Sequence, residues 1–110
     1  MEKVEDAFLG MSAVHTINNA VICVLSLLYG RMHTTGAITT AVMCGHDTDC
    51  NGATVGSVVG AAAGRRAFDG ALAPRLNDTI RPNVIGFQEV TMKELAERTL
   101  RQFRRVTGHA

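Results

Sequence analysis

The sequence predicts an all-α domain of about four helices, with an irregular segment before the last helix. Three observations support this fold class. Residues 14–29 are almost entirely apolar in their second half, glycines recur every four residues within 52–64, and residues 91–108 have clear helical periodicity. Because 110 residues suffice for one small domain with one modest core, we expect a single helical domain over residues 1–110.

The first predicted helix covers Val14–Tyr29. Residues 20–28 contain one polar residue, Ser26, and a helix that is apolar all round is normally enclosed on every side. Residues 7–30 contain no Asp, Glu, Lys or Arg, which raises the question of a membrane span. Four polar residues interrupt the stretch: His15, Thr16, Asn18 and Asn19. The purely apolar part is too short to cross a bilayer, so we expect a soluble protein with no membrane partner.

Two further helices are predicted, a short one over Ala37–Cys44 and a longer one over about Asn51–Arg66. One face of the longer helix carries a stripe of glycines: Gly52, Gly56, Gly60 and Gly64. Each glycine inside a helix costs about 1 kcal/mol relative to alanine. The stripe therefore predicts that another backbone or a ligand comes very close. A strand over Thr54–Val59 is the alternative, but the fourfold spacing has no explanation in a strand.

The segment between Phe68 and Val90 is predicted to be irregular, because prolines and glycines interrupt it. The last helix follows and is the clearest element of the sequence. Thr91 and Glu94 form a capping box at its start, and Gly108 closes its end.

The balance of charge argues against a nucleic-acid partner. The chain has 11 Lys and Arg residues against 10 Asp and Glu residues, whereas phosphate binding needs an excess of cations. Four arginines lie on the last predicted helix: Arg98, Arg101, Arg104 and Arg105. We interpret them as a solvated face that complements the helix C-terminus, with Glu94–Arg98 and Glu97–Arg101 as supporting pairs. RNA binding by these arginines is the alternative.

Cysteine usage and the N-terminus indicate a cellular compartment. There are three cysteines, Cys23, Cys44 and Cys50, with no CxxC spacing, so a disulfide framework is not expected. The N-terminal residues MEKVEDAF do not have the order of a secretion signal. A reducing environment fits best, and we expect a cytoplasmic protein.

The candidate site is the stretch GHDTDCNGATVG, residues 45–56. Asp47 and Asp49 are separated by Thr48, and on a helix side chains at this spacing point in nearly opposite directions. In an extended or turn conformation both fall on the same side and can hold one cation. Carboxylate oxygens favour hard ions such as Mg²⁺ or Mn²⁺. The spacing is therefore compatible with a divalent-metal site at this turn.

Three other interpretations of the same stretch are open. In the first, Asp49 caps the following helix and Asp47 holds the turn through its own backbone. In the second, Cys44, His46 and Cys50 bind zinc, although their spacing matches no familiar structural pattern. In the third, Cys50 is a nucleophile activated by His46, with no third group to orient the histidine.

The stretch also resembles a known family. GHDTDCNGATVGSVVGAAAG (45–64) is similar to the C-terminal signature of the ADP-ribosylglycohydrolase superfamily, in which a G-x-DTD turn enters a glycine- and alanine-rich helix. HTINNAVICVLSLLYG (15–30) and segments within 76–99 resemble flanking regions of a bacterial branch that is dinitrogenase reductase-activating glycohydrolase-like. The resemblance implies an all-helical fold, a two-ion Mg²⁺ or Mn²⁺ centre, and hydrolysis of the glycosidic bond that joins ADP-ribose to a protein side chain or a related small molecule.

The resemblance also implies roles for individual residues. Asp47 and Asp49 match two metal-ligating aspartates, and Cys50 occupies the position of a Thr or Ser whose hydroxyl also ligates in many members. A thiol is a soft ligand and matches Mg²⁺ poorly, so Cys50 either weakens that contact or leaves it to water. Four polar residues are expected to line a pocket for an ADP-ribose-containing ligand: His15, Asn18, Asn19 and His46. For the first three, helix capping or buried hydrogen bonding is the alternative.

One departure from the family pattern leads to two hypotheses. The family's other ligands, an early acidic residue and a Thr-Asp-Asp motif, have no counterpart in this sequence, so we expect the metal-site half of a hydrolase, incomplete as an isolated chain and completed by an N-terminal half. We assign no catalytic residue. The alternative is a non-catalytic helical module that homo-oligomerises or binds a partner protein. A few helices cannot enclose residues 20–28 on every side, so apolar surface should remain for association.

Overall fold

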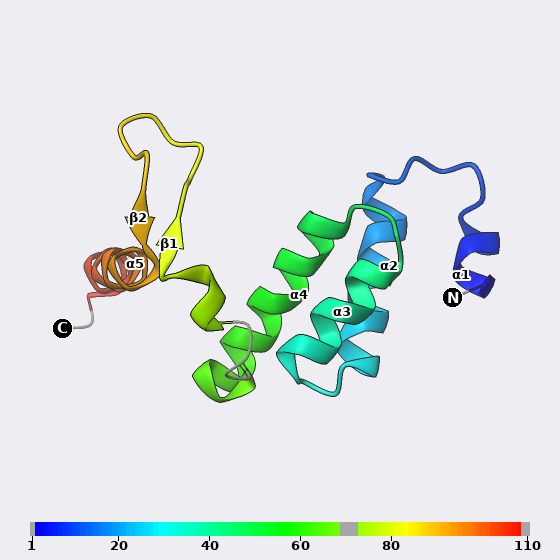
Figure 1. Ribbon diagram of the computed structural model, residues 1–110, viewed down its shortest axis with the longest axis horizontal. Helices are drawn as coiled ribbons and strands as arrows, with labels where there is room; N and C mark the ends of the chain where they lie inside the picture. The colour runs from blue at the N-terminus through cyan, green and yellow to red at the C-terminus, as the bar shows by residue number, and fades with distance from the viewer. Residues whose placement is uncertain (1, 69–72, 109–110) are drawn as a thin grey trace. The chain divides into compact units, whose positions relative to one another are not determined.

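The computed structural model describes residues 2–68 and 73–108, which fall into two compact units, Met1–Asp69 and Gly70–Ala110. The elements of the first unit are α1 (Glu2–Ala7), α2 (Thr16–Tyr29), α3 (Thr34–Met43), α4 (Thr48–Ala63) and the 3-10 helix η1 (Gly64–Ala67) (Figure 1). Those of the second are the 3-10 helix η2 (Ala73–Leu76), β1 (Thr79–Ile80), β2 (Val90–Thr91) and α5 (Met92–Thr107). The predicted all-α fold class is confirmed, because the strands described have two residues each.

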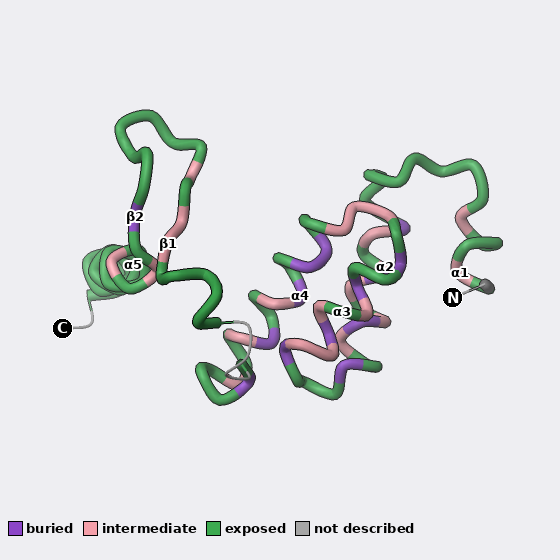
Figure 2. The backbone as a smooth tube through the Cα atoms, viewed as in Figure 1, coloured by how far each residue is buried: buried purple, intermediate pink, exposed green. Residues whose placement is uncertain are grey.

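The core of the first unit lies where α2, α3 and α4 meet. Its buried cluster consists of Ala37 and Ala41 of α3, Val55 and Val59 of α4, and Ala67 of η1. The buried positions lie on the facing sides of these helices (Figure 2). Alanines on α3 leave room for the valines of α4, so the two helices bury small side chains at close range.

The helix α2 is buried on one side only. Ile22 and Ser26 are buried, whereas Ile17, Val24 and Leu28 are 54%, 56% and 69% exposed. The expectation of a helix enclosed on every side is therefore wrong for the described chain, and the apolar surface expected to remain is present. No helix within residues 2–68 and 73–108 is long and apolar enough to cross a membrane.

Three glycines of the stripe, Gly52, Gly56 and Gly60, face side chains. A Cβ atom added at Gly52 would lie 3.7 Å from Ile38 and Val42, and one at Gly56 would lie 3.2 Å from Cδ1 of Ile38. At these positions the expected close approach of another backbone is wrong, because the nearest described atoms belong to flexible side chains. A close backbone approach occurs instead at Gly30, where a Cβ would lie 2.5 Å from the backbone of Ala37.

The helix boundaries are near the predicted ones, with one shift that matters. The expected helix at about Asn51–Arg66 begins earlier, at Thr48, and ends at Ala63. It ends there because Gly64 has a φ of 62°, outside the helical region. The chain then continues as η1.

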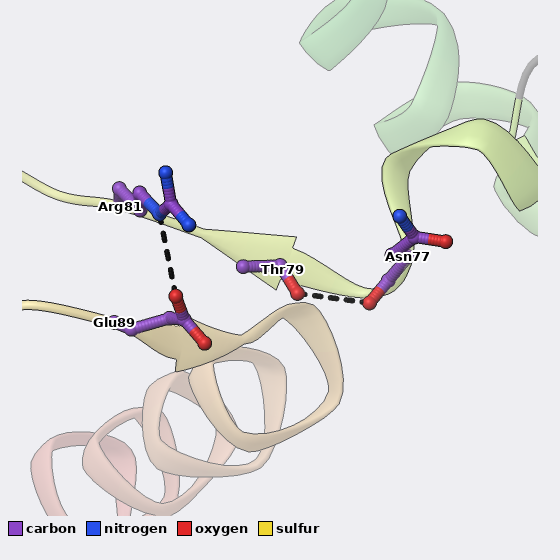
Figure 3. A network of polar contacts seen from close by, with 4 residues as sticks. All are labelled: Asn77, Thr79, Arg81 and Glu89. Atoms are coloured by element: carbon purple, nitrogen blue, oxygen red, sulfur yellow. Dashed lines mark hydrogen bonds and ion pairs between the residues drawn. The ribbon is translucent and has the colours of Figure 1, made fainter.

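In the second unit, the segment expected to be irregular contains η2 and a short antiparallel pair. Thr79 pairs with Thr91 and Ile80 with Val90. Beyond this pair, Nε of Arg81 donates to Oε2 of Glu89 at 3.3 Å (Figure 3). Both side chains are well exposed, so this ion pair contributes little to stability.

The capping signals of α5 are confirmed. The Glu94 backbone N–H donates to Oγ1 of Thr91 at 3.0 Å, and Gly108 adopts the left-handed conformation. The expected pair of Glu94 with Arg98 forms at 2.6 Å, whereas the ion pair described for Glu97 is with Lys93 at 4.0 Å. No described residue of α5 is buried. Its apolar side chains line an open groove: Met92, Leu95, Leu100 and Phe103.

Candidate metal centre

The two aspartates lie at the start of α4. Asp47 is the N-cap residue, with φ of −76° and ψ of 75°, and Asp49 belongs to the first turn of the helix. The expectation that both lie in a non-helical turn is therefore wrong for Asp49. Because Asp47 precedes the helix and has a non-helical ψ, the rule that separates side chains two apart on a helix does not apply to this pair.

Three side chains converge at this point. A carboxylate oxygen of Asp47, a carboxylate oxygen of Asp49 and Sγ of Cys50 all lie within 4.8 Å of one another. Among residues 2–68 and 73–108, this is the one group of three or more His, Cys, Asp or Glu side chains with such spacing. Asp47 is half-buried and the other two are exposed, so the group is open to solvent.

The capping interpretation of these aspartates does not describe the structure. The N-cap residue is Asp47 rather than Asp49, and the Asp47 side chain accepts no capping hydrogen bond from the first turn of α4. An N-cap aspartate usually accepts one from the amide of the second or third helical residue. The Asp47 carboxylate is thus not committed to the helix end.

The carboxylates of Asp47 and Asp49 raise the pKa of the neighbouring Cys50 thiol. A hydrogen bond to Asp47 raises the pKa of Cys50 above its ordinary value, and the negative charges of Asp47 and Asp49 raise it further. An activated cysteine nucleophile needs the opposite shift, toward a stable thiolate. This direction argues against Cys50 as a nucleophile activated by His46.

The zinc interpretation that combined Cys44, His46 and Cys50 is wrong, because those three do not form a group within ligand range in the described chain. Cys44 is buried, and its thiol donates to the backbone oxygen of Thr40 at 3.2 Å. None of the three cysteines, all of which lie in the described part of the chain, forms a disulfide.

The polar residues of α2 make structural hydrogen bonds. His15 is the N-cap of α2, and its Nδ1 accepts from the Ile17 backbone N–H at 3.2 Å. Nδ2 of the buried Asn18 donates to the Ser12 backbone oxygen at 3.0 Å and lies 3.4 Å from Nδ1 of His46. The Asn18–His46 contact ties the segment before α4 to α2.

A residue that sequence reasoning did not select completes this connection. Asn51, 3% exposed, donates from Nδ2 to Oδ1 of Asn19 at 2.6 Å and accepts from the Cys23 thiol at 3.5 Å. Asn51 directly follows Cys50, so these bonds fix the first turn of α4. The sequence signal that could have indicated Asn51 is an amide side chain within a helix of mainly small, apolar residues. Its partner, Asn19, is 32 residues away in the sequence.

The donor set fits a divalent cation in part. Two carboxylates suit a hard ion such as Mg²⁺ or Mn²⁺, as the family resemblance implies. The third donor, a thiol, suits a softer ion. The group offers three donors, whereas Mg²⁺ needs near-octahedral oxygen coordination, so the described residues supply part of a magnesium site.

The fold is thus all-α, with a candidate cation site at the start of a glycine-rich helix. The family model for ADP-ribosylglycohydrolase matches residues 1–108, essentially the whole sequence. The chain belongs to the ADP-ribosylglycohydrolase family. No curated protein matches, and no solved structure matches.

Proposed function

We propose that this chain provides the metal-binding part of an ADP-ribosylglycohydrolase that cleaves ADP-ribose glycosidic bonds with the help of Mg²⁺ or Mn²⁺. The observation that carries the proposal is the convergence of Asp47, Asp49 and Cys50 within 4.8 Å at the start of α4. Family membership adds the reaction class, hydrolysis of the bond between ADP-ribose and its acceptor.

The residues of the chain have distinct tasks in this proposal. Asp47 and Asp49 bind the cation from one side. When bound, a divalent cation supplies Lewis-acid chemistry and orients substrate oxygens. Asn18 and Asn51 position the aspartates, because their hydrogen bonds tie the start of α4 to α2.

Substrate contact is assigned to His46 first. It is half-buried and directly precedes Asp47 in the sequence. His15, Asn18 and Asn19 were expected to line the same pocket, but each makes hydrogen bonds within the helical unit. We therefore propose that these three shape the pocket by holding its wall.

The proposed centre needs further ligands. Two carboxylates and a thiol fall short of the oxygen ligands that two Mg²⁺ ions require. The proposal therefore includes a complementary segment, equivalent to an N-terminal half, as the partner that completes the centre.

The test combines binding and turnover. Calorimetric titration of the purified chain with Mn²⁺ should give saturable binding that Asp47→Ala and Asp49→Ala abolish. Asp6→Asn, which changes an exposed acidic residue outside the group, should leave the binding unchanged. Release of ADP-ribose from ADP-ribosyl-arginine is then measured with Mg²⁺ or Mn²⁺. Unchanged metal binding in both alanine variants would exclude the proposed site.

A specific observation favours a second function, that of a non-catalytic module. Ile17, Val24 and Leu28 are each more than half exposed on α2, at helical spacing, in a helix without charged residues. Such a face suits association with a second copy or a partner protein. Analytical ultracentrifugation would show concentration-dependent association that Val24→Glu abolishes. Metal-dependent release of ADP-ribose by the pure chain would exclude a purely non-catalytic role.

A further inference from the structure

We propose that the Asp47–Asp49–Cys50 group prefers thiophilic divalent ions such as Zn²⁺ and Cd²⁺ over Mg²⁺, with Cys50 as the residue that sets this preference. The inference rests on the proposed metal site and concerns which ion that site selects. It starts from the one donor in the group that does not suit a hard cation.

The spacing of the three donors suits a single small ion. Donors bonded to zinc lie about 2.0–2.3 Å from it, so two donors of one tetrahedral ion are about 3.3–3.8 Å apart. The three atoms of this group already lie within 4.8 Å of one another. Rotation of the exposed Asp49 and Cys50 side chains toward the half-buried Asp47 would bring the three donors to bonding distance of one ion.

The number of donors in the group also suits zinc better than magnesium. Zinc sites that react with ligands use three protein donors in tetrahedral geometry and leave a fourth position open. The group has three donors and is open to solvent, because Asp49 and Cys50 are exposed. Magnesium would find two of its six oxygen ligands here, and a sulfur atom at a third position.

The sulfur donor of Cys50 is what makes the group prefer Zn²⁺ and Cd²⁺ to Mg²⁺. A thiolate binds Zn²⁺ and Cd²⁺ strongly and Mg²⁺ weakly, whereas carboxylates accept all three ions. When the sulfur–metal bond forms, the S–H bond breaks and its proton leaves to solvent. The hydrogen bond that the thiol makes with Asp47 is thereby replaced by a shared metal ion.

Replacement by an oxygen donor isolates this effect. Cys50→Ser keeps the size and the hydrogen-bonding ability of the side chain but exchanges the soft donor for a hard one. Because Cys50 is exposed, the variant should fold normally. Cys44→Ala is the matched control, since it removes a thiol that lies outside the group.

The experiment measures metal binding by the purified full chain, with each metal alone. Calorimetric titrations with Mg²⁺, Zn²⁺ and Cd²⁺ give dissociation constants, and ultraviolet absorption reports the thiolate-to-Cd²⁺ charge-transfer band. We expect Zn²⁺ and Cd²⁺ to bind at least about tenfold more tightly than Mg²⁺. Cys50→Ser should remove the absorption band and weaken Cd²⁺ binding at least about tenfold, without weakening Mg²⁺ binding. Cys44→Ala should retain the band.

Each contrary result has a defined meaning. If Cys50→Ser leaves Cd²⁺ binding and its absorption band intact, or if Cys44→Ala removes the band, Cys50 does not select the ion. If Asp47→Ala abolishes binding while Cys50→Ser changes nothing, the inference fails and the proposed metal site stands. If neither variant changes the binding of any ion, both fail.

Discussion

The side-chain amide of Asn51 donates a 2.6 Å hydrogen bond to the side-chain oxygen of Asn19. This bond joins the first turn of α4, which carries Asp49 and Cys50, to the first turn of α2. Asn19 is itself held by bonds from its Nδ2 to the backbone oxygens of Ala13 and His15, at 2.7 and 3.0 Å. The candidate metal centre is therefore positioned by buried amides as well as by its own helix.

Asn51→Ala should lower the free energy of unfolding by about 1–3 kcal/mol, because it leaves the half-buried Asn19 oxygen without this donor. Urea denaturation followed by circular dichroism measures the effect. Ser57→Ala, at an exposed position of the same helix, is the control and should change stability by less than about 0.5 kcal/mol. If Asn51→Ala and Ser57→Ala were equally stable, the hydrogen bond between Asn51 and Asn19 would make no contribution to the free energy of unfolding.

Two glycine-to-alanine substitutions should change the free energy of unfolding in opposite directions. Gly30→Ala places a Cβ 2.5 Å from the Ala37 backbone, so it should destabilise the fold by at least about 1–3 kcal/mol. Gly52→Ala places its Cβ 3.7 Å from the side chains of Ile38 and Val42, an ordinary contact, and should stabilise α4 by up to about 1 kcal/mol. Thermal unfolding of both variants is the measurement. A stable Gly30→Ala variant would contradict the close approach of the loop and α3.

The part of the fold that was predictable depends on local signals. The capping box of Thr91 and Glu94 and the left-handed Gly108 lie within a few residues of the helix ends that they define, so the sequence predicts α5 closely. The convergence of Asp47 and Asp49 concerns neighbours in sequence and was also foreseeable. The start of α4 was less predictable, since Thr48 and Asp49 are weak helix formers.

Long-range relationships explain what the sequence did not predict. The bond between Asn51 and Asn19 spans 32 residues, and no periodicity or spacing identifies such a pair. The glycine stripe predicted a close approach of another backbone, whereas the atoms near Gly52 and Gly56 belong to side chains, at 3.7 and 3.2 Å from an added Cβ. Whether a backbone or a side chain such as Ile38 fills the space depends on the angle between α3 and α4, which tertiary packing decides.

The thiol of Cys50 should react slowly with alkylating reagents despite its exposure. Its pKa is raised by the hydrogen bond to Asp47 and by the charges of both aspartates, so the reactive thiolate forms only at a higher pH than for an ordinary thiol. In the presence of a chelator, Asp47→Ala should lower this pKa and increase the rate of carbamidomethylation near pH 8. Mass spectrometry of the Cys50 peptide across a pH series measures the rate. Identical pH profiles for the wild type, Asp47→Ala and the control Asp6→Asn would contradict the predicted coupling.

Thr34→Val should leave the protein as stable as the wild type or make it more stable. The hydroxyl of Thr34 is buried without a hydrogen-bond partner, so it carries a desolvation cost of about 1–3 kcal/mol with no compensating bond. Valine has nearly the same shape and removes that cost. Thr40→Val is the matched control on the same helix, because the Thr40 hydroxyl already donates to the Gly36 backbone oxygen at 2.8 Å and its removal should bring no gain. Thermal unfolding compares the two variants, and a lower midpoint for Thr34→Val than for Thr40→Val would mean that the Thr34 hydroxyl has a partner in solution.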